Sequence, residues 1–177
     1  NMIDKFGKVI LTMFGIGYFK YAPGTIASLL TCILFLYLFK IGFNLIVIVF
    51  FLPIIIIYSA KLIDKLSKKF KKIDAREIVI DEFIGQSIAI IPWYIMAADF
   101  ILIDNIEGSA EKFIYLVILS FIFFRFFDIV KPFPINLIDR KMKNGWGVIL
   151  DDIIAGIFSF ITTYICLGIY VIYFLKL

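Results

Sequence analysis

Five long stretches with almost no charged residues dominate this sequence and limit what it can fold into. They run over residues 21–39, 41–60, 83–98, 113–130 and 153–175, and the only charges within them are Arg125 and Asp128. A helix that crosses a bilayer needs about 20 mostly apolar residues. We therefore expect an all-α polytopic membrane protein with about five transmembrane helices, folded as a single integral membrane domain over residues 1–177.

The composition excludes several classes of protein. Hydrophobic residues make up 63% of the chain, and a soluble domain of this length could not bury so much apolar surface. This argues against a cytosolic enzyme and against a nucleic-acid-binding domain. The chain has no histidine, which excludes every mechanism that needs a histidine base, nucleophile or metal ligand. Cys32 and Cys166 each lie within an apolar stretch, which argues against a disulfide framework or a zinc site.

The basic residues predict how the chain crosses the membrane. With the N-terminus in the cytosol, all of the 18 lysines and arginines except Lys40, Lys112 and Lys176 fall on the cytosolic side, as the positive-inside rule requires. Residues 61–72 alternate apolar and basic positions at helical spacing, which predicts an amphipathic continuation of the second span on the cytosolic surface. Residues 9–19 are apolar but too short to span, so we expect an interfacial or re-entrant segment there.

Ionisable residues within the spans form three groups. Asp81-Glu82 opens the third span, Arg125 and Asp128 lie in the last turns of the fourth, and Asp151-Asp152 opens the fifth. Such residues are costly in a bilayer and usually functional. The expected topology places all three groups at the same cytosolic depth, together with Lys131. The sequence therefore predicts that five carboxylates converge at one level of the membrane.

A divalent cation would relieve the repulsion within such a cluster. Gly85, Ala155 and Gly156 adjoin the acids, and small residues let membrane helices approach closely. Oxygen ligands without histidine or cysteine favour Mg²⁺ or Mn²⁺. Each acid that opens a span also fits an interfacial residue stabilised by the helix dipole. That interpretation does not account for Asp128, which lies near a helix C-terminus, so a metal site is favoured.

The start of the first apolar stretch offers a partner for an anion. Pro23-Gly24-Thr25 enters a helix, and Thr25 as an N-cap would leave free backbone N–H groups there that can bind phosphate. On these residues alone, a capped helix start is the favoured interpretation. Beside a carboxylate-metal cluster, a phosphate-binding role gains weight.

After the fourth span, Pro132 and Pro134 end the helix beside Lys131, and residues 135–141 predict an amphipathic surface helix. Within it, we expect Asp139-Arg140 to form a local ion pair in preference to a headgroup pocket. Residues 144–147, Asn-Gly-Trp-Gly, predict a flexible turn.

Several short blocks of this sequence resemble the phosphatidylglycerophosphatase A family and occur in the family's order. The blocks are Ala22-Pro23-Gly24-Thr25 with Ser28, Asp81-Glu82-Phe83-Ile84-Gly85, Phe124-Arg125 with Asp128, Lys131-Pro132 with Pro134-Ile135, Asp139-Arg140, and Gly145 and Gly147 followed by Asp151-Asp152 and Ala155-Gly156. Lys20, Ala27 and Asn144 depart from the family's usual proline, glycine and glycine. The resemblance implies Mg²⁺-dependent hydrolysis of phosphatidylglycerophosphate to phosphatidylglycerol and phosphate in the bacterial cytoplasmic (inner) membrane.

These observations combine into one hypothesis for the site, facing the cytosol. The catalytic and metal-binding candidates are Asp81, Glu82, Asp128, Asp151 and Asp152. The candidates for binding the substrate phosphate are Arg125, Lys131, Thr25, Ser28 and Arg140. One alternative is a metal-dependent phosphoalcohol transferase, but its regularly spaced Asp and Gly residues are missing. The other is a cation transporter, which would place its carboxylates near mid-membrane rather than at one end.

Overall fold

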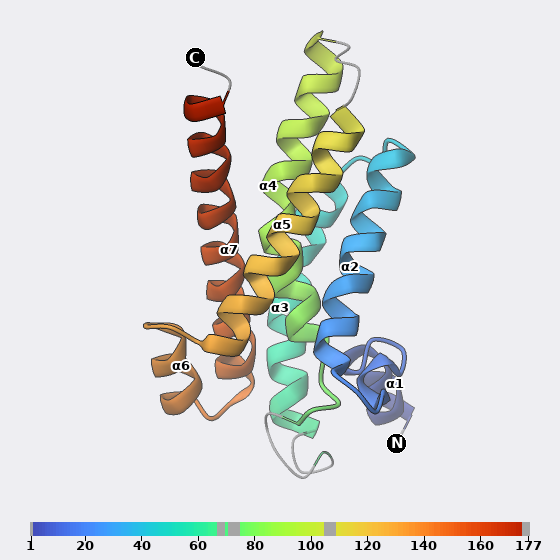
Figure 1. Cartoon of the computed structure of the whole chain (residues 1–177). Helices are drawn as coiled ribbons and strands as arrows, with labels where there is room; N and C mark the ends of the chain where they lie inside the picture. Colours follow the sequence, from blue (N-terminus) through green and yellow to red (C-terminus); the bar gives the residue numbers. More distant parts are fainter. Residues whose placement is uncertain (1, 67–69, 71–74, 105–108, 175–177) are drawn as a thin grey trace.

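The computed structural model describes residues 2–66, 70, 75–104 and 109–174, and this part of the chain contains seven α-helices and one short 3-10 helix (Figure 1). In chain order they are α1 (Met2–Leu11), the 3-10 helix η1 (Ile16–Tyr18), α2 (Pro23–Lys40), α3 (Ile46–Leu66), α4 (Ile80–Asp104), α5 (Ser109–Val130), α6 (Ile135–Lys141) and α7 (Gly145–Phe174). The expected all-helical class is confirmed.

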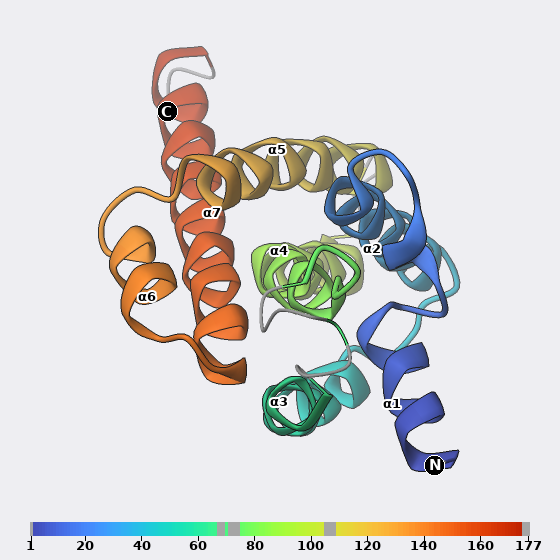
Figure 2. The ribbon, with the colours of Figure 1, turned by 90° about the horizontal axis from the view of Figure 1, so that it is seen from below.

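Helix α4 lies at the centre of the bundle, with α2, α5, α7 and α3 around it (Figure 2). Its buried side chains include Ile84, Ile90 and Trp93, and these pack against apolar residues of the surrounding helices. A helix enclosed in this way presents apolar residues on most of its faces, which is why no single polar stripe was visible in residues 83–98.

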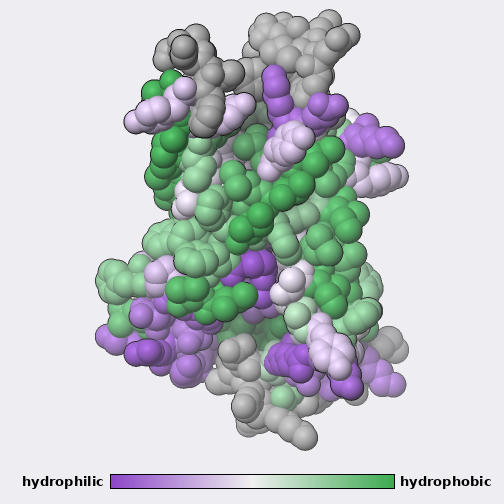
Figure 3. All heavy atoms as spheres, viewed as in Figure 1, coloured by the Kyte–Doolittle hydropathy of each residue, from purple (hydrophilic) through white to green (hydrophobic). Residues whose placement is uncertain are grey.

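The face of the bundle seen in Figure 3 is largely apolar along the length of the helices. Within the described residues, α2, α3, α5 and α7 are long and apolar enough to cross a membrane. Large side chains such as Phe50, Tyr115 and Ile129 are more than half exposed. Exposing so much apolar surface to water would be strongly unfavourable in free energy. The chain is therefore a membrane protein. The third predicted span, residues 83–98, lies within α4, which is not among these four helices, so four of the five predicted spans are supported within the described residues.

The starts of α2, α4 and α7 and the end of α5 all lie at one end of the bundle, next to α1 and α6 (Figure 1). This arrangement follows from the connections, since the five long helices alternate in direction along the chain. The three groups of ionisable residues singled out in the sequence are therefore brought to the same end, as the sequence predicts.

Two segments at this end differ from the expectation. Residues 9–19 are not one segment, because α1 ends at Leu11 and turns lead into η1. Helix α1 lies against α3, where Gly7 approaches Leu62 and Leu66. The amphipathic continuation of the second span is confirmed as far as Leu66, the end of α3. Residues 67–69 and 71–74 lie outside the described residues.

The predicted flexible turn at residues 144–147 is wrong. Helix α7 begins at Gly145, because its first N–H groups find acceptors. The Asn144 Oδ1 accepts from the Gly147 N–H at 2.9 Å, and the Asp64 Oδ1 of α3 accepts from the Gly145 N–H at 2.6 Å. Asp151 and Asp152 therefore lie beyond the first turn of α7, where stabilisation by the helix dipole has faded.

Candidate active site

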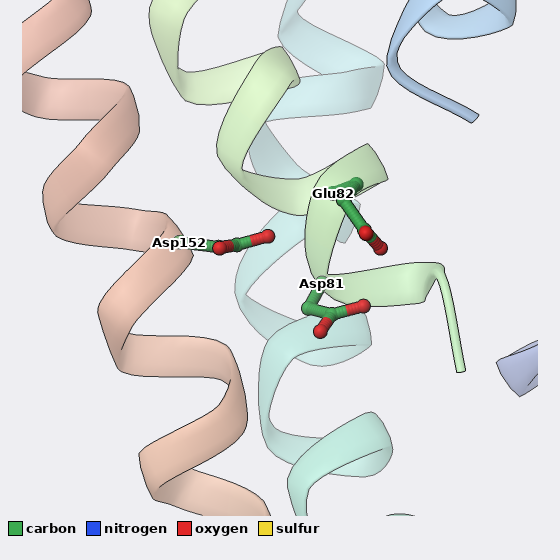
Figure 4. Close-up of side chains that lie close together, drawn as sticks. All are labelled: Asp81, Glu82 and Asp152. Atoms are coloured by element: carbon green, nitrogen blue, oxygen red, sulfur yellow. The ribbon is translucent and has the colours of Figure 1, made fainter. Parts of the chain in front are cut away.

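Three carboxylates from two helices converge at the bundle end described above. Asp81 and Glu82 lie in the first turn of α4, and Asp152 extends towards them from α7 (Figure 4). One carboxylate oxygen from each of the three lies within 4.8 Å of the others. That spacing allows all three oxygens to contact a single small cation.

Small residues make this convergence possible. A Cβ atom on Gly156 of α7 would lie 2.3 Å from the carbonyl oxygen of Gly85 on α4. A Cβ atom on Gly85 would in turn lie 2.6 Å from the carbonyl oxygen of Asp152. The two backbones are therefore closer than any larger residue would permit, as the sequence predicts. On the other side of α4, Gly24 of α2 packs directly against the carboxylate of Glu82.

Two of the convergent carboxylates are buried and the third, Glu82, is partly buried, and part of their hydrogen-bonding capacity is unused. Asp81 is 8% exposed and Asp152 is 4% exposed. Among the described residues, no donor contacts the Oδ1 of Asp81 or the Oε2 of Glu82. Buried carboxylate oxygens without partners are costly. A bound cation would compensate that cost, so the residues present fit a divalent metal ion with oxygen ligands.

The other two predicted acids are paired with basic residues. The Asp128 Oδ2 lies 2.6 Å from the Arg125 Nη1, and the Asp151 Oδ2 lies 2.6 Å from the Lys131 Nζ. The Asp151 Oδ1 also accepts from the backbone N–H of Asp152 at 3.1 Å. These contacts hold Asp128 and Asp151 in place beside the three convergent carboxylates.

Lys131 also reaches α6. Its Nζ lies 3.1 Å from the Asp139 Oδ1, so the expected local ion pair between Asp139 and Arg140 is wrong. The reason is geometric: the chain folds back after α5 and brings α6 against Lys131, whereas adjacent residues of one helix do not face each other. Burial alone would lower the pKa of Lys131, but hydrogen bonds and charges from Asp151 and Asp139 outweigh it and raise the pKa above its usual value.

A cavity of about 410 Å³ joins these groups. Its lining residues come from the start of α2, the segment before α4, the start of α4, the end of α5 and the start of α7; among them are all five acids, Arg125, Lys131, Thr25 and Arg76. The cavity is large enough for a phosphorylated headgroup and is lined by both signs of charge.

The remaining phosphate-binding candidates differ in how they lie relative to the cavity. Thr25 lines the cavity, but it is not the N-cap. Helix α2 begins two residues earlier, at Pro23, because proline is well suited to the first turn of a helix. Ser28 is buried, donates to the Gly24 carbonyl oxygen at 3.0 Å, and lies 3.5 Å from the Arg125 Nη1. Arg140 is exposed on α6 and does not line the cavity.

Arg76 is a cavity residue that sequence reasoning missed. It lies in the segment before α4, is exposed, and donates to the carbonyl oxygen of Lys20. Among the described residues, no carboxylate lies within ion-pair distance of it. In the sequence, Arg76 ends a run of basic residues that indicates the cytosolic side of the membrane. No neighbouring residue distinguishes it from the other basic residues of that run.

This chain is similar to known proteins over most of its length. The phosphatidylglycerophosphatase A family matches residues 9–167. A phosphatidylglycerophosphatase A of Haemophilus influenzae is 33% identical over 152 residues, which cover 85% of this chain and 82% of the relative. One of Escherichia coli is 32% identical over 152 residues, covering 82% of this chain and 74% of the relative.

A third relative carries a different name. It is a putative phosphatidylinositol-3-phosphatase of Bacteroides thetaiotaomicron, 33% identical over 159 residues, which cover 86% of this chain and 88% of the relative. No solved structure matches this chain. The family match includes all five acids of the site, and these relatives cover most of the chain, so the chain belongs to the phosphatidylglycerophosphatase A family of phosphomonoesterases.

Proposed function

We propose that this protein removes the terminal phosphate of phosphatidylglycerophosphate, using a divalent cation, Mg²⁺, at the cytosolic surface of a bacterial inner membrane. The observation that carries the proposal is the convergence of Asp81, Glu82 and Asp152 within a cavity that also presents basic residues. The names of the Haemophilus influenzae and Escherichia coli relatives supply the substrate. The number of basic residues at the same end of the bundle supports the cytosolic orientation.

In this proposal, Asp81, Glu82 and Asp152 hold the cation. Oxygen donors alone suit Mg²⁺, and two of the donor oxygens have no other partner among the described residues. When bound there, the ion supplies Lewis-acid chemistry and offsets negative charge on the phosphoryl oxygens.

The basic residues of the cavity have distinct parts in the proposal. Arg125 binds a phosphate oxygen while Asp128 fixes the orientation of its guanidinium group, and charge-assisted hydrogen bonds of this kind are among the strongest that proteins make. Arg76 has no carboxylate partner among the described residues, so its guanidinium group is available to a second phosphate oxygen. Lys131 stays bonded to Asp151 and Asp139 and contributes its charge to the cavity wall.

Phosphate release from purified protein in detergent tests the proposal. We expect release from phosphatidylglycerophosphate that stops with EDTA and returns when Mg²⁺ is added. Asp81→Asn and Asp152→Asn should each lower kcat by about 100-fold or more, because each removes a negative ligand oxygen. Glu111→Gln is the control, since Glu111 is exposed in the first turn of α5, outside the cavity.

Phosphatidylinositol 3-phosphate is the natural comparison substrate, because the Bacteroides thetaiotaomicron relative carries that name. A larger kcat/KM for that lipid would contradict the substrate assignment and leave the reaction class standing. Release that persists after metal removal would contradict the role given to the three carboxylates. Cation flux through liposomes without any lipid substrate would favour the transporter alternative instead.

A further inference from the structure

The cavity reaches the outer surface of the bundle between α2 and α5. Thr25 on α2 lines one side of it, and Asp128 and Ile129 on α5 line the other. Ile129 contributes to the lining although 70% of its surface is exposed, which places it at the rim. Figure 3 shows a hydrophilic patch at this position, between α5 and the lower half of α2, surrounded by apolar surface.

Apolar residues continue along both helices from this opening. On α5, the exposed residues Ile118, Ile122 and Ile129 follow each other at helical spacing. On α2, the exposed residues Leu29 and Ile33 succeed Thr25 at intervals of four. Residues three, four or seven positions apart share one face of a helix. A polar cavity with a metal-binding cluster thus meets, at its edge, two apolar helix faces that lead along the membrane-spanning part of the bundle.

We propose that this opening is a lateral entrance for lipid, in which the phosphate group enters the cavity while the acyl chains lie along α2 and α5. The inference rests on the proposed function, since it assigns the place of the chains of a diacyl substrate. The headgroup must reach buried carboxylates. If the acyl chains followed the headgroup through water, every exposed methylene group would make the transfer less favourable. An opening on the side of the bundle satisfies both requirements.

A substitution of Ile129 can test whether this opening admits lipid. Its side chain lies where the glycerol backbone of the lipid would pass from the cavity to the acyl chains. Replacing it with asparagine places a polar amide in the path of the chains and leaves every carboxylate and basic residue of the cavity unchanged.

The first test compares two substrates of one enzyme. One is dioleoyl phosphatidylglycerophosphate in mixed micelles, and the other is its deacylated, water-soluble headgroup. Ile129→Asn should lower kcat/KM for the dioleoyl lipid by about tenfold and change kcat/KM for the headgroup by less than about twofold. The matched control is Ile57→Asn on α3, since Ile57 is also exposed but α3 lies across α4 from α5 (Figure 2). The control should change neither value more than about twofold.

The second test does not depend on turnover. Ile129→Trp and Ile57→Trp proteins are placed in phosphatidylcholine vesicles that contain a few per cent of a phosphonate analogue of phosphatidylglycerophosphate with brominated chains. The tryptophan introduced by Ile129→Trp should be quenched more strongly by this analogue than by an equal fraction of brominated phosphatidylcholine. The tryptophan introduced by Ile57→Trp should be quenched equally by both lipids, after subtraction of the signal from Trp93 and Trp146.

Each outcome separates the two proposals. The lateral entrance would be overturned if Ile129→Asn lowered kcat/KM equally for both substrates, or for neither, and both brominated lipids quenched the introduced tryptophan equally. The phosphatase assignment would then remain intact. Selective quenching in a protein that releases no phosphate would overturn the phosphatase assignment and support the entrance as a lipid-binding surface.

Discussion

Replacing Gly156 with alanine tests whether the close approach of α4 and α7 assembles the carboxylate cluster. Gly156 lies one helical turn after Asp152, and its Cα faces the Gly85 carbonyl oxygen of α4. The added Cβ would lie 2.3 Å from that oxygen, whereas ordinary contacts are about 3.5 Å or longer. Because the obstacle is backbone rather than a flexible side chain, the helices themselves must separate by about 1 Å.

Two consequences follow from that separation. Overpacking a tight contact costs about 1–3 kcal/mol of stability, so the variant should unfold several degrees below the wild type. Asp152 moves with α7 while Asp81 and Glu82 stay on α4, so the three oxygens no longer meet at ligand distance. A misplacement of about 1 Å at a reacting centre can lower the rate about 100-fold, and we expect a loss of kcat of that order.

Gly168→Ala is the matched control on the same helix. A Cβ atom there has no neighbour within 4 Å among the described residues, and alanine is the better helix former by about 1 kcal/mol. Thermal unfolding in detergent and phosphate release at saturating Mg²⁺ measure both effects. Gly168→Ala should keep the kcat of the wild type and unfold at the same or a slightly higher temperature. The reasoning is refuted if Gly156→Ala keeps both the unfolding temperature and the kcat of the wild type.

Three further substitutions test other contacts at this end of the bundle. Arg76→Gln should raise KM for the lipid about tenfold with little change in kcat, because it removes one charge-assisted hydrogen bond to phosphate; an unchanged KM would contradict this. Lys131→Met leaves Asp151 buried without its ion pair, so thermal unfolding should show a loss of about 3 kcal/mol, which Asp151→Asn added to the same protein should partly restore. Asn144→Ala removes the cap on the Gly147 N–H and should cost about 1 kcal/mol of stability. Its kcat should stay at the wild-type value, and a large loss of kcat would show that the cap also positions the site.

The long helices and the gathering of the acids could be predicted because both depend on the lengths and order of the apolar runs. Long apolar runs set the helices, and their alternating direction brings Asp81-Glu82 and Asp151-Asp152 to the same end. The proximity of α4 and α7 could also be foreseen, since Gly85 and Gly156 stand next to the acids that they bring together.

The start of α7 could not be predicted from its own residues. Asn-Gly-Trp-Gly is typical of a turn, and the acceptor that fixes the Gly145 N–H is the carboxylate of Asp64 on α3. Asp64 is distant in the sequence and lies within a run of lysines. No local pattern connects the two, so only the folded arrangement of α3 and α7 shows that the helix begins at Gly145.

Only some of the ion pairs at this end of the bundle could be predicted from the sequence. Arg125 and Asp128 are three residues apart on one helix, and their contact follows from that spacing. Lys131 was expected to bind phosphate, yet it bonds to Asp151 of α7 and Asp139 of α6. Both of these depend on how the chain folds back after α5. The availability of Arg76 to the cavity likewise depends on tertiary packing, because the segment before α4 places it there.

The pairing of these charges bears on how many ions the site can hold. Asp128 and Asp151 are already compensated by Arg125 and Lys131, so their oxygens are less available to a metal. Asp81, Glu82 and Asp152 are left, and their oxygens converge on one point. Three carboxylates around one divalent ion leave about one negative charge, which the guanidinium group of Arg76 at the cavity can offset. A phosphate dianion then enters a cavity that is close to neutral. In the proposed mechanism, a second divalent ion would need ligands from the paired acids and would release Arg125 and Lys131, so we propose a site for one ion rather than two.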